Sequence, residues 1–117
     1  MYHTRYLEFF ERARFELFQA LDPGAVIPSS DGGGYVVGDM NVHFRKPARL
    51  GERFRIETTV KEVKRVSFVL TQKALSAKSG DLYCEADVTI AKVGSDWKAA
   101  LLSPRIQEGL KAGLSAV

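Results

Sequence analysis

One amphipathic segment at the start of the chain constrains the fold more than any other feature of the sequence. Residues 1–21 read MYHTRYLEFFERARFELFQAL, and their apolar side chains recur at steps of three and four residues. This spacing places them on one wide face of a helix of about five turns. The predicted face consists of Tyr6, Phe9, Phe10, Ala13, Leu17, Ala20 and Leu21. A helix with such a face needs a covering partner, and the rest of the chain offers strands.

The other side of this helix is charged. Its members are Arg5, Glu8, Glu11, Arg12, Arg14 and Glu16. Glu8 with Arg12 and Glu11 with Arg14 have the spacing of helical ion pairs, so we predict that this face is solvated. The helix should end at Asp22, because Pro23 cannot continue it.

From Tyr35 onward the hydrophobic pattern changes to a period of two residues, which is typical of half-buried strands. A first run ends at Pro47, and three long runs follow at 53–61, 67–74 and 82–90. The predicted inward side chains are Met40, Val42, Phe44, Phe54, Ile56, Thr58, Val60, Phe68, Leu70, Gln72, Ala74, Leu82, Cys84, Ala86, Val88 and Ile90. Tyr83 falls on the wet face in this pattern. Short connections indicate an antiparallel meander.

Two elements are predicted after the meander. Residues 97–102 could pair as a last short strand, after the turn at 94–96. Pro104 then opens a terminal helix with a narrow apolar stripe formed by Ile106, Leu110 and Leu114.

The composition is that of a globular protein with one core. The 117 residues are 45% hydrophobic and 26% charged, which predicts a single domain over 1–117. The sequence contains no apolar run long enough to cross a bilayer and does not start as a signal peptide, so we expect a cytoplasmic location. Cys84 is the only cysteine. Its place in a strand pattern predicts a small buried hydrophobic residue rather than a nucleophile.

The formal net charge of +3 biases the surface toward anionic partners. We do not expect nucleic acid among them, because the basic residues are spread out and form no nucleic-acid-binding module. The glycine triplet at 32–34 is not a phosphate loop, because no Lys-Ser/Thr pair follows it.

Three segments carry a resemblance to a known family. YH at 2–3 is followed by YLEFFERAR at 6–14, PARLGE occupies 47–52 and SFVLTQ occupies 67–72. Together with the strand at 83–93, they span nearly the whole chain. The sequence resembles the hotdog-fold acyl-CoA thioesterases related to 4-hydroxybenzoyl-CoA thioesterase, in particular the branch associated with the Tol-Pal system.

The resemblance implies an α+β hotdog fold, in which a curved antiparallel sheet wraps a long central helix. It also implies hydrolysis of an acyl-CoA thioester to free CoA and a carboxylic acid, without a metal or a bound cofactor. We expect a homodimer or homotetramer, because a single sheet would leave long edges unpaired.

The resemblance places catalysis at the start of the helix, at Tyr2 and His3. Backbone N–H groups there would polarise the thioester carbonyl. A helix cap is the structural alternative for His3. The family's catalytic Asp lies several residues before this pair, so no catalytic carboxylate is carried over to this chain. We expect that Met1 is an internal methionine and that the family's first strand is missing from 1–117.

Three other carboxylates were considered as substitutes for that Asp, namely Glu8, Glu11 and Asp39. A helical Glu near Arg12 is more typical of a solvated ion pair, and Asp39 is more distant. The lack of a carboxylate favours an alternative function, a non-catalytic hotdog module that binds acyl-CoA or acyl carrier protein.

The remaining predicted site residues bind substrate. Tyr6, Phe9 and Phe10 would line an acyl tunnel along the helix. The CoA phosphates would contact the basic residues Arg45, Lys46, Arg49, Lys64 and Arg65, for which a solvated basic face is the alternative. Ser67 would hydrogen-bond the pantetheine or simply start a strand. His43 is predicted to lie at the surface.

Overall fold

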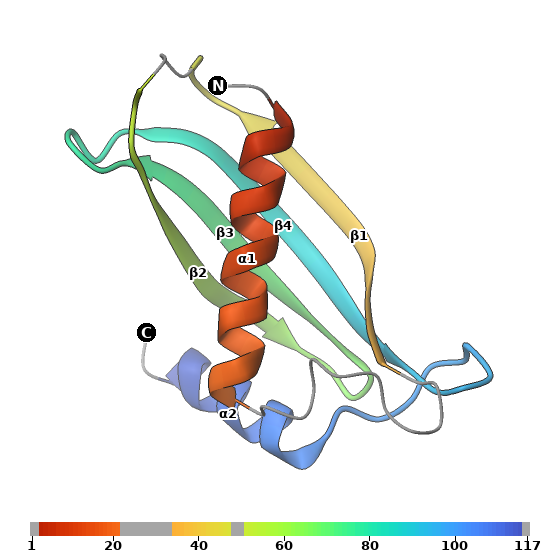
Figure 1. Cartoon of the computed structure of the whole chain (residues 1–117). Coiled ribbons are helices and arrows are strands. Elements are labelled where there is room, and N and C mark those ends of the chain that lie inside the picture. Colours follow the sequence, from red (N-terminus) through yellow and green to blue (C-terminus); the bar gives the residue numbers. More distant parts are fainter. Residues whose placement is uncertain (1–2, 22–33, 48–50, 116–117) are drawn as a thin grey trace.

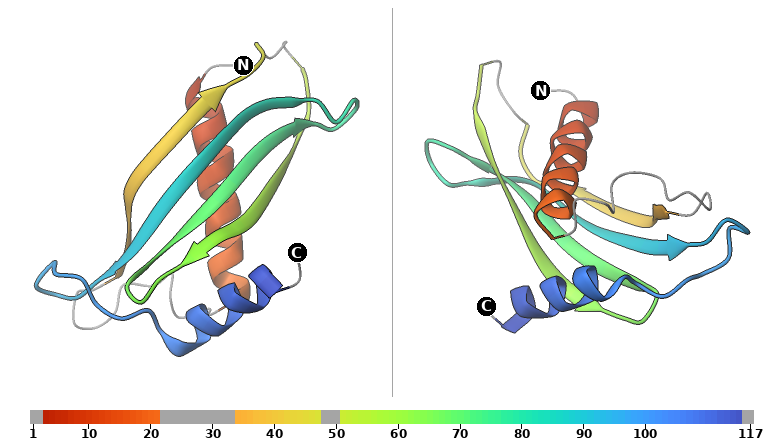
Figure 2. Two further views of the ribbon diagram at one scale, coloured as in Figure 1. Left: turned by 180° about the vertical axis from the view of Figure 1, so that it is seen from behind. Right: turned by 60° about the horizontal axis from the view of Figure 1, so that its bottom comes forward.

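The computed structural model describes residues 3–21, 34–47 and 51–115. Its elements are α1 (His3–Leu21), β1 (Gly34–Phe44), β2 (Phe54–Val63), β3 (Ser67–Ser76), β4 (Leu82–Val93) and α2 (Pro104–Ser115). The strands form one antiparallel sheet in the order β1-β4-β3-β2. Helix α1 lies along one face of this curved sheet, and α2 lies near the end of α1 (Figure 1). Seen from behind, the sheet covers α1 (Figure 2). The predicted α+β architecture is confirmed.

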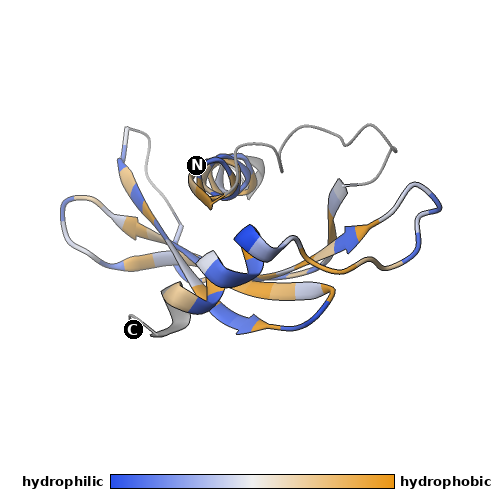
Figure 3. Ribbon diagram, turned by 90° about the horizontal axis from the view of Figure 1, so that it is seen from below, coloured by the Kyte–Doolittle hydropathy of each residue, from blue (hydrophilic) through white to orange (hydrophobic). Residues whose placement is uncertain are grey.

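The two central strands have the predicted alternation. On β3 the buried residues run from Phe68 through Leu70, Gln72 and Ala74 to Ser76, with half-buried residues between them. On β4 the buried residues are Cys84, Ala86, Val88 and Ile90. Seen from below, α1 lies on one side of the sheet and hydrophobic and hydrophilic residues alternate along the strands (Figure 3). The core therefore lies between α1 and the middle of the sheet.

The buried face of α1 differs from the predicted one. Tyr6, Phe10, Arg14 and Phe18 are buried at every fourth position, whereas Ala20 is exposed. The prediction for Arg14 was wrong because β3 places a polar partner opposite it. The Arg14 guanidinium donates a hydrogen bond from Nη1 to Oε1 of Gln72 at 2.8 Å. Burial lowers the pKa of Arg14, and the neighbouring Glu11 opposes that shift.

Gln72 ties the helix to the sheet. Its Nε2 donates to the backbone carbonyl of Phe10 at 2.9 Å and to Oγ1 of Thr58 at 3.1 Å, while its Oε1 accepts from Arg14. Gln72 was predicted only to face inward from its strand. In the structure, its side chain makes the hydrogen bonds that join α1, β2 and β3 within the core. Buried networks of this kind are stabilising when every member has a partner.

A register shift changes the start of β4. Ala74 pairs with Cys84, but the next residue of β3, Leu75, pairs with Leu82, which leaves Tyr83 as the extra residue of a β-bulge. Leu82 therefore lies on the side of Leu75, and Tyr83 packs against the core. The sequence pattern predicted the reverse for both residues, because alternation alone cannot reveal an inserted residue.

Residues 97–102 do not form the predicted last strand. In the part of the chain that the structure describes, this segment forms one isolated bridge, between Val93 and Ala99, and Leu102 donates its N–H to the Arg65 carbonyl. Trp97 has a φ of 62° and is 74% exposed, so the chain turns where the strand was expected to begin.

The terminal helix is confirmed. α2 begins at Pro104, and Ser103 caps it, since its Oγ accepts a hydrogen bond from the N–H of Ile106 at 3.3 Å. Ile106 and Leu110 are buried, as predicted, and the side chain of Leu114 lies outside the described residues. The amphipathic face of α2 thereby closes one end of the core.

Cys84 is a buried core residue, as predicted. Burial, and then the charge of Glu85, raise the pKa of its thiol to about 11. A thiol that is neutral and inaccessible at neutral pH does not act as a nucleophile.

Candidate functional site

Four segments meet at one end of the molecule. They are the start of α1, the end of β1, the start of β2 and the turn between β3 and β4 (Figure 1). The first backbone N–H groups of a helix have no partner within the helix and form the positive end of its dipole. This is the end at which catalysis was predicted. Tyr2 lies outside the described residues, and of His3 only the backbone, as the first residue of α1, is described.

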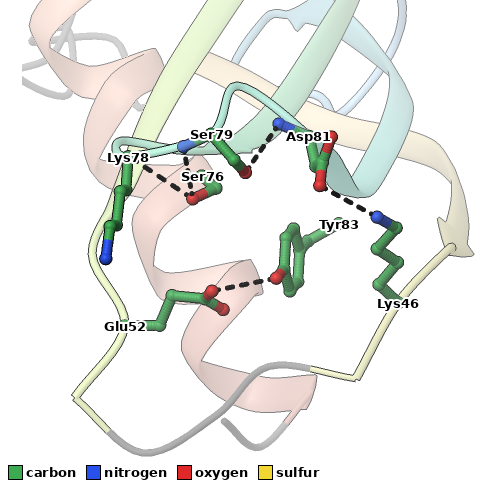
Figure 4. Close-up of polar contacts among 7 residues, drawn as sticks. All are labelled: Lys46, Glu52, Ser76, Lys78, Ser79, Asp81 and Tyr83. Carbon is green, nitrogen blue, oxygen red and sulfur yellow. Dashed lines mark hydrogen bonds and ion pairs between the residues drawn. The ribbon is translucent and has the colours of Figure 1, made fainter.

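A polar cluster occupies this end of the sheet (Figure 4). The hydroxyl of Tyr83 donates to Oε1 of Glu52 at 2.9 Å, and this hydrogen bond is the main reason why the pKa of Tyr83 is raised. On the other side of the Tyr83 ring, Lys46 donates from Nζ to Oδ2 of Asp81 at 3.0 Å. This pair raises the pKa of Lys46 and lowers that of Asp81.

Aromatic rings form the floor of this cluster. The ring of Phe54 makes edge contacts with Tyr6 at 5.5 Å and with Tyr83 at 5.3 Å between centroids. The hydroxyl of Tyr6 and Oε2 of Glu52 are both buried, and neither has a hydrogen-bond partner among the described residues. Burial, followed by the charges of Cys84, Glu52 and Tyr83, raises the pKa of Tyr6 to about 12. Tyr6 is therefore a neutral hydrogen-bond donor at neutral pH.

The cluster borders an open cavity of about 420 Å³. Its lining residues are Gly51, Glu52, Arg53, Ser76, Ala77, Lys78 and Ser79. The Oγ of Ser76 accepts hydrogen bonds from the backbone N–H groups of Lys78 and Ser79 at 3.3 and 3.2 Å, which fixes the turn on one side of the cavity. Glu52 is half-buried and brings a carboxylate to this wall.

A second cavity, of about 240 Å³, lies between α1 and the edge strand β1. Its lining residues are Glu11, Arg14, Phe15, Phe18, Tyr35, Val36, Val37 and Ile90. The three residues predicted to line an acyl tunnel are not among them. Tyr6 and Phe10 are packed in the core, at 2% and 0% exposure, and Phe9 is half-buried. The structure thus places the open space along α1 one to three turns farther from the helix start than predicted.

The predicted CoA-binding cations are divided between the two ends of the sheet. Arg45 and Lys46 follow β1, and the backbone N–H groups of both donate hydrogen bonds to the Tyr83 carbonyl, at the end where the polar cluster lies. Lys64, Arg65 and Ser67 lie at the β2–β3 turn, where Ser67 pairs with Ala91. Phe44 pairs with Cys84, so the two groups are separated along β4 by roughly 23 Å at about 3.3 Å per residue. Within one chain they form no common site.

Several of these cations already have partners. Arg45 forms an ion pair with Glu85, and Lys64 lies 3.9 Å from Glu62. Such exposed pairs contribute about 0–1 kcal/mol, so a phosphate could replace the carboxylate at little cost. Arg49 lies outside the described residues.

The other residues considered from the sequence lie at the surface. Glu8, Glu11, Asp39 and His43 are exposed. Among the described residues, no group of three or more His, Cys, Asp or Glu side chains could hold a metal ion. Within the same residues, neither helix is long and apolar enough to span a membrane.

Fold and site together define a class of α+β proteins. In this class, the central helix begins at the end of a curved sheet that carries a polar cluster. The family described as the Thioesterase-like superfamily matches residues 1–112. The chain belongs to this superfamily.

Curated relatives agree with the assignment. The chain is 34% identical over 82 residues to the acyl-CoA thioesterase YbgC of Helicobacter pylori, a match that covers 70% of this chain and 59% of that protein. It is 31% identical over 93 residues to the acyl-CoA thioester hydrolase YbgC of Escherichia coli O6:H1, covering 80% of this chain and 69% of the relative. The chain thus spans 59% of the length of the H. pylori protein.

Solved structures confirm the hotdog architecture. A probable thioesterase from Bartonella henselae superposes with a TM-score of 0.73 at 30% identity, covering 88% of this chain and 85% of that chain. A 1,4-dihydroxy-2-naphthoyl-CoA thioesterase from Synechocystis superposes with a TM-score of 0.81 at 16% identity, covering 95% and 82%. The second similarity is one of fold alone.

Proposed function

We propose that this protein hydrolyses acyl-CoA thioesters and releases free CoA and a carboxylic acid. The observation that carries the proposal is the match to relatives named acyl-CoA thioesterase and acyl-CoA thioester hydrolase, which covers 70% and 80% of this chain. The geometry supports it, because the start of α1 lies at the end of the molecule that carries the polar cluster, and Glu52 of that cluster lines an open cavity. Helix N–H groups at such a place can stabilise the oxyanion that forms when a thioester carbonyl is attacked.

Tyr2 and His3 remain the proposed catalytic residues at the helix start. For substrate binding, the cavity between α1 and β1 is the better candidate for the acyl group, while Arg45 and Lys46 are the predicted CoA-binding cations at the end that carries the polar cluster. Tyr6, Phe9 and Phe10 would then support the site from the core. Arg49, Lys64, Arg65 and Ser67 remain proposed CoA contacts.

The activity is tested by incubating the purified chain with acetyl-, hexanoyl-, decanoyl-, palmitoyl- and benzoyl-CoA and measuring free thiol with a chromogenic reagent. We expect CoA release from at least one substrate. Cys84 adds no background, because its thiol is buried and neutral. Tight binding of CoA or acyl-CoA by the folded chain without turnover would instead support the alternative, a non-catalytic module that binds acyl-CoA or acyl carrier protein.

We further propose that the protein works as a homodimer, or as a homotetramer built from such dimers, in the cytoplasm. β1 is an edge strand of the described sheet. Val37 on β1 is 48% exposed, and Phe15 on α1, which lines the same cavity, is 49% exposed. Large apolar side chains on a sheet edge favour pairing with a second sheet. A second copy that continues the sheet at β1 would cover both.

Replacing Phe15 with glutamate is therefore expected to convert the dimer to a monomer of 13.0 kDa, because a charge would be buried in the interface. Light scattering coupled to size exclusion measures the mass. Leu101→Glu is the matched control, since Leu101 is 62% exposed and is not among the residues that line the cavity between α1 and β1. An unchanged mass for Phe15→Glu would contradict this interface.

A further inference from the structure

Glu52 is the one carboxylate among the described residues with a buried oxygen atom that lacks a hydrogen-bond partner. Its other oxygen accepts from the Tyr83 hydroxyl at 2.9 Å, which fixes the orientation of the carboxylate. Tyr83 reaches this position only because the β-bulge turns it toward the core. The carboxylate is therefore oriented by the fold and retains one free acceptor position.

The Tyr6 hydroxyl supplies the complementary group. It is buried, has no partner in the described part of the chain, and lies close enough to Glu52 for that carboxylate to raise its pKa. Tyr6 stays protonated at neutral pH and can donate one hydrogen bond. Buried polar groups in native proteins are normally satisfied, by ordered water if not by protein. A neutral donor and a free carboxylate oxygen are the two partners that a water molecule needs to be held and activated.

We propose that Glu52 is the general base of the thioester hydrolysis proposed above, that Tyr6 holds the attacking water and that Tyr83 positions Glu52. The proposal rests on that proposed function. Oε2 of Glu52 takes a proton from the water while the water oxygen forms a bond to the thioester carbon. The carbonyl electrons move onto oxygen, where the N–H groups at the start of α1 stabilise them. When the tetrahedral species collapses, the C–S bond breaks and Glu52 returns the proton to the sulfur of CoA. The acid and CoA leave, and the carboxylate is regenerated.

The surroundings of Glu52 suit this role. It lines the open cavity of about 420 Å³, through which a thioester could approach. Arg53 and Lys78 line the same cavity and would attract an anionic substrate. Glu8 and Glu11, the helical carboxylates considered from the sequence, are exposed. Glu52, in contrast, is half-buried, and its Oε2 is buried.

The test is the rate of CoA release by Glu52→Gln, which keeps the shape of the side chain and removes the base. Its matched control is Glu57→Gln on β2, the strand that follows Glu52, where Glu57 is exposed and pairs with Arg55. We expect kcat to fall about 100-fold or more in Glu52→Gln, with KM changed less than threefold, and to stay within twofold in the control. Circular dichroism must show that both variants are folded. A folded Glu52→Gln variant with kcat within threefold of the wild type would overturn the proposal.

Tyr83→Phe tests the positioning role of Tyr83 and does not depend on the folding of Glu52→Gln. The change removes only the hydroxyl that orients Glu52, so we expect kcat to fall about tenfold while KM changes less than threefold. A folded Tyr83→Phe variant with an unchanged kcat would overturn the positioning role of Tyr83. If the wild type releases CoA and Glu52→Gln does so equally, only this proposal fails. If the wild type releases no CoA from any substrate, the proposed function fails, and the role of Glu52 fails with it.

Discussion

Replacing Gln72 with leucine is expected to lower the free energy of unfolding by about 3 kcal/mol, because it leaves the buried Arg14 guanidinium without its partner. Arg14 is only 9% exposed, so water replaces the lost hydrogen bond only in part. The carbonyl of Phe10 and the hydroxyl of Thr58 lose a donor in the same change. Urea unfolding followed by circular dichroism gives the difference.

The matched control is the double variant Arg14→Met, Gln72→Leu. It removes both polar partners, and we expect it to recover most of the lost stability, since replacing a whole buried polar pair by apolar groups is often nearly neutral. A Gln72→Leu variant as stable as the wild type would show that Arg14 does not depend on Gln72. A double variant no better than the single one would show that the network has no coupling between these two residues.

The second large effect is expected at Leu70, in the middle of β3. Leu70→Ala should cost about 2–5 kcal/mol, because the side chain has 0% exposure and its removal leaves a cavity between the sheet and α1. Leu101→Ala is the same substitution at a position that is 62% exposed, and it should change stability by less than about 0.5 kcal/mol.

Denaturant midpoints of the two leucine variants are measured side by side with the wild type. Circular dichroism is the better probe, since the only tryptophan, Trp97, is 74% exposed and reports poorly on the core. Equal midpoints for the two variants would contradict the position of Leu70 in the core.

Periodicity predicted the elements of this fold because most side chains obey it. The long helix, the three-strand meander and the terminal helix all follow from the spacing of apolar residues. The spacing could not predict the burial of Arg14, because hydropathy treats a guanidinium as exposed and the compensating amide of Gln72 lies 58 residues away. It could not predict the inward turn of Tyr83 either, because a bulge is set by the pairing of two strands.

The candidate site was less predictable than the fold. The sequence predicted a site at the start of the helix, yet it gave no reason to single out Glu52 in the PARLGE segment. What marks Glu52 is that its half-buried carboxylate lies beside the hydroxyl groups of Tyr6 and Tyr83. This arrangement forms only when β2, β4 and α1 are assembled. The sequence also could not show how the basic residues are distributed over the sheet. Positive charge alone grouped Lys46 with Lys64, whereas the strand pairing places them at opposite ends of the sheet.

The bulge at Tyr83 also bears on which deletions this chain can tolerate. Removing Tyr83 alone would join Leu82 directly to Cys84 and leave an uninterrupted ladder opposite Leu75 and Ala74. Every other side chain of β4 would keep its present face. Removing one residue between 84 and 90 would instead transfer part of the strand from the dry face to the wet face. Position 83 is thus a spare position for the architecture of β4, and its occupant is free to serve the chemistry at the end of the sheet.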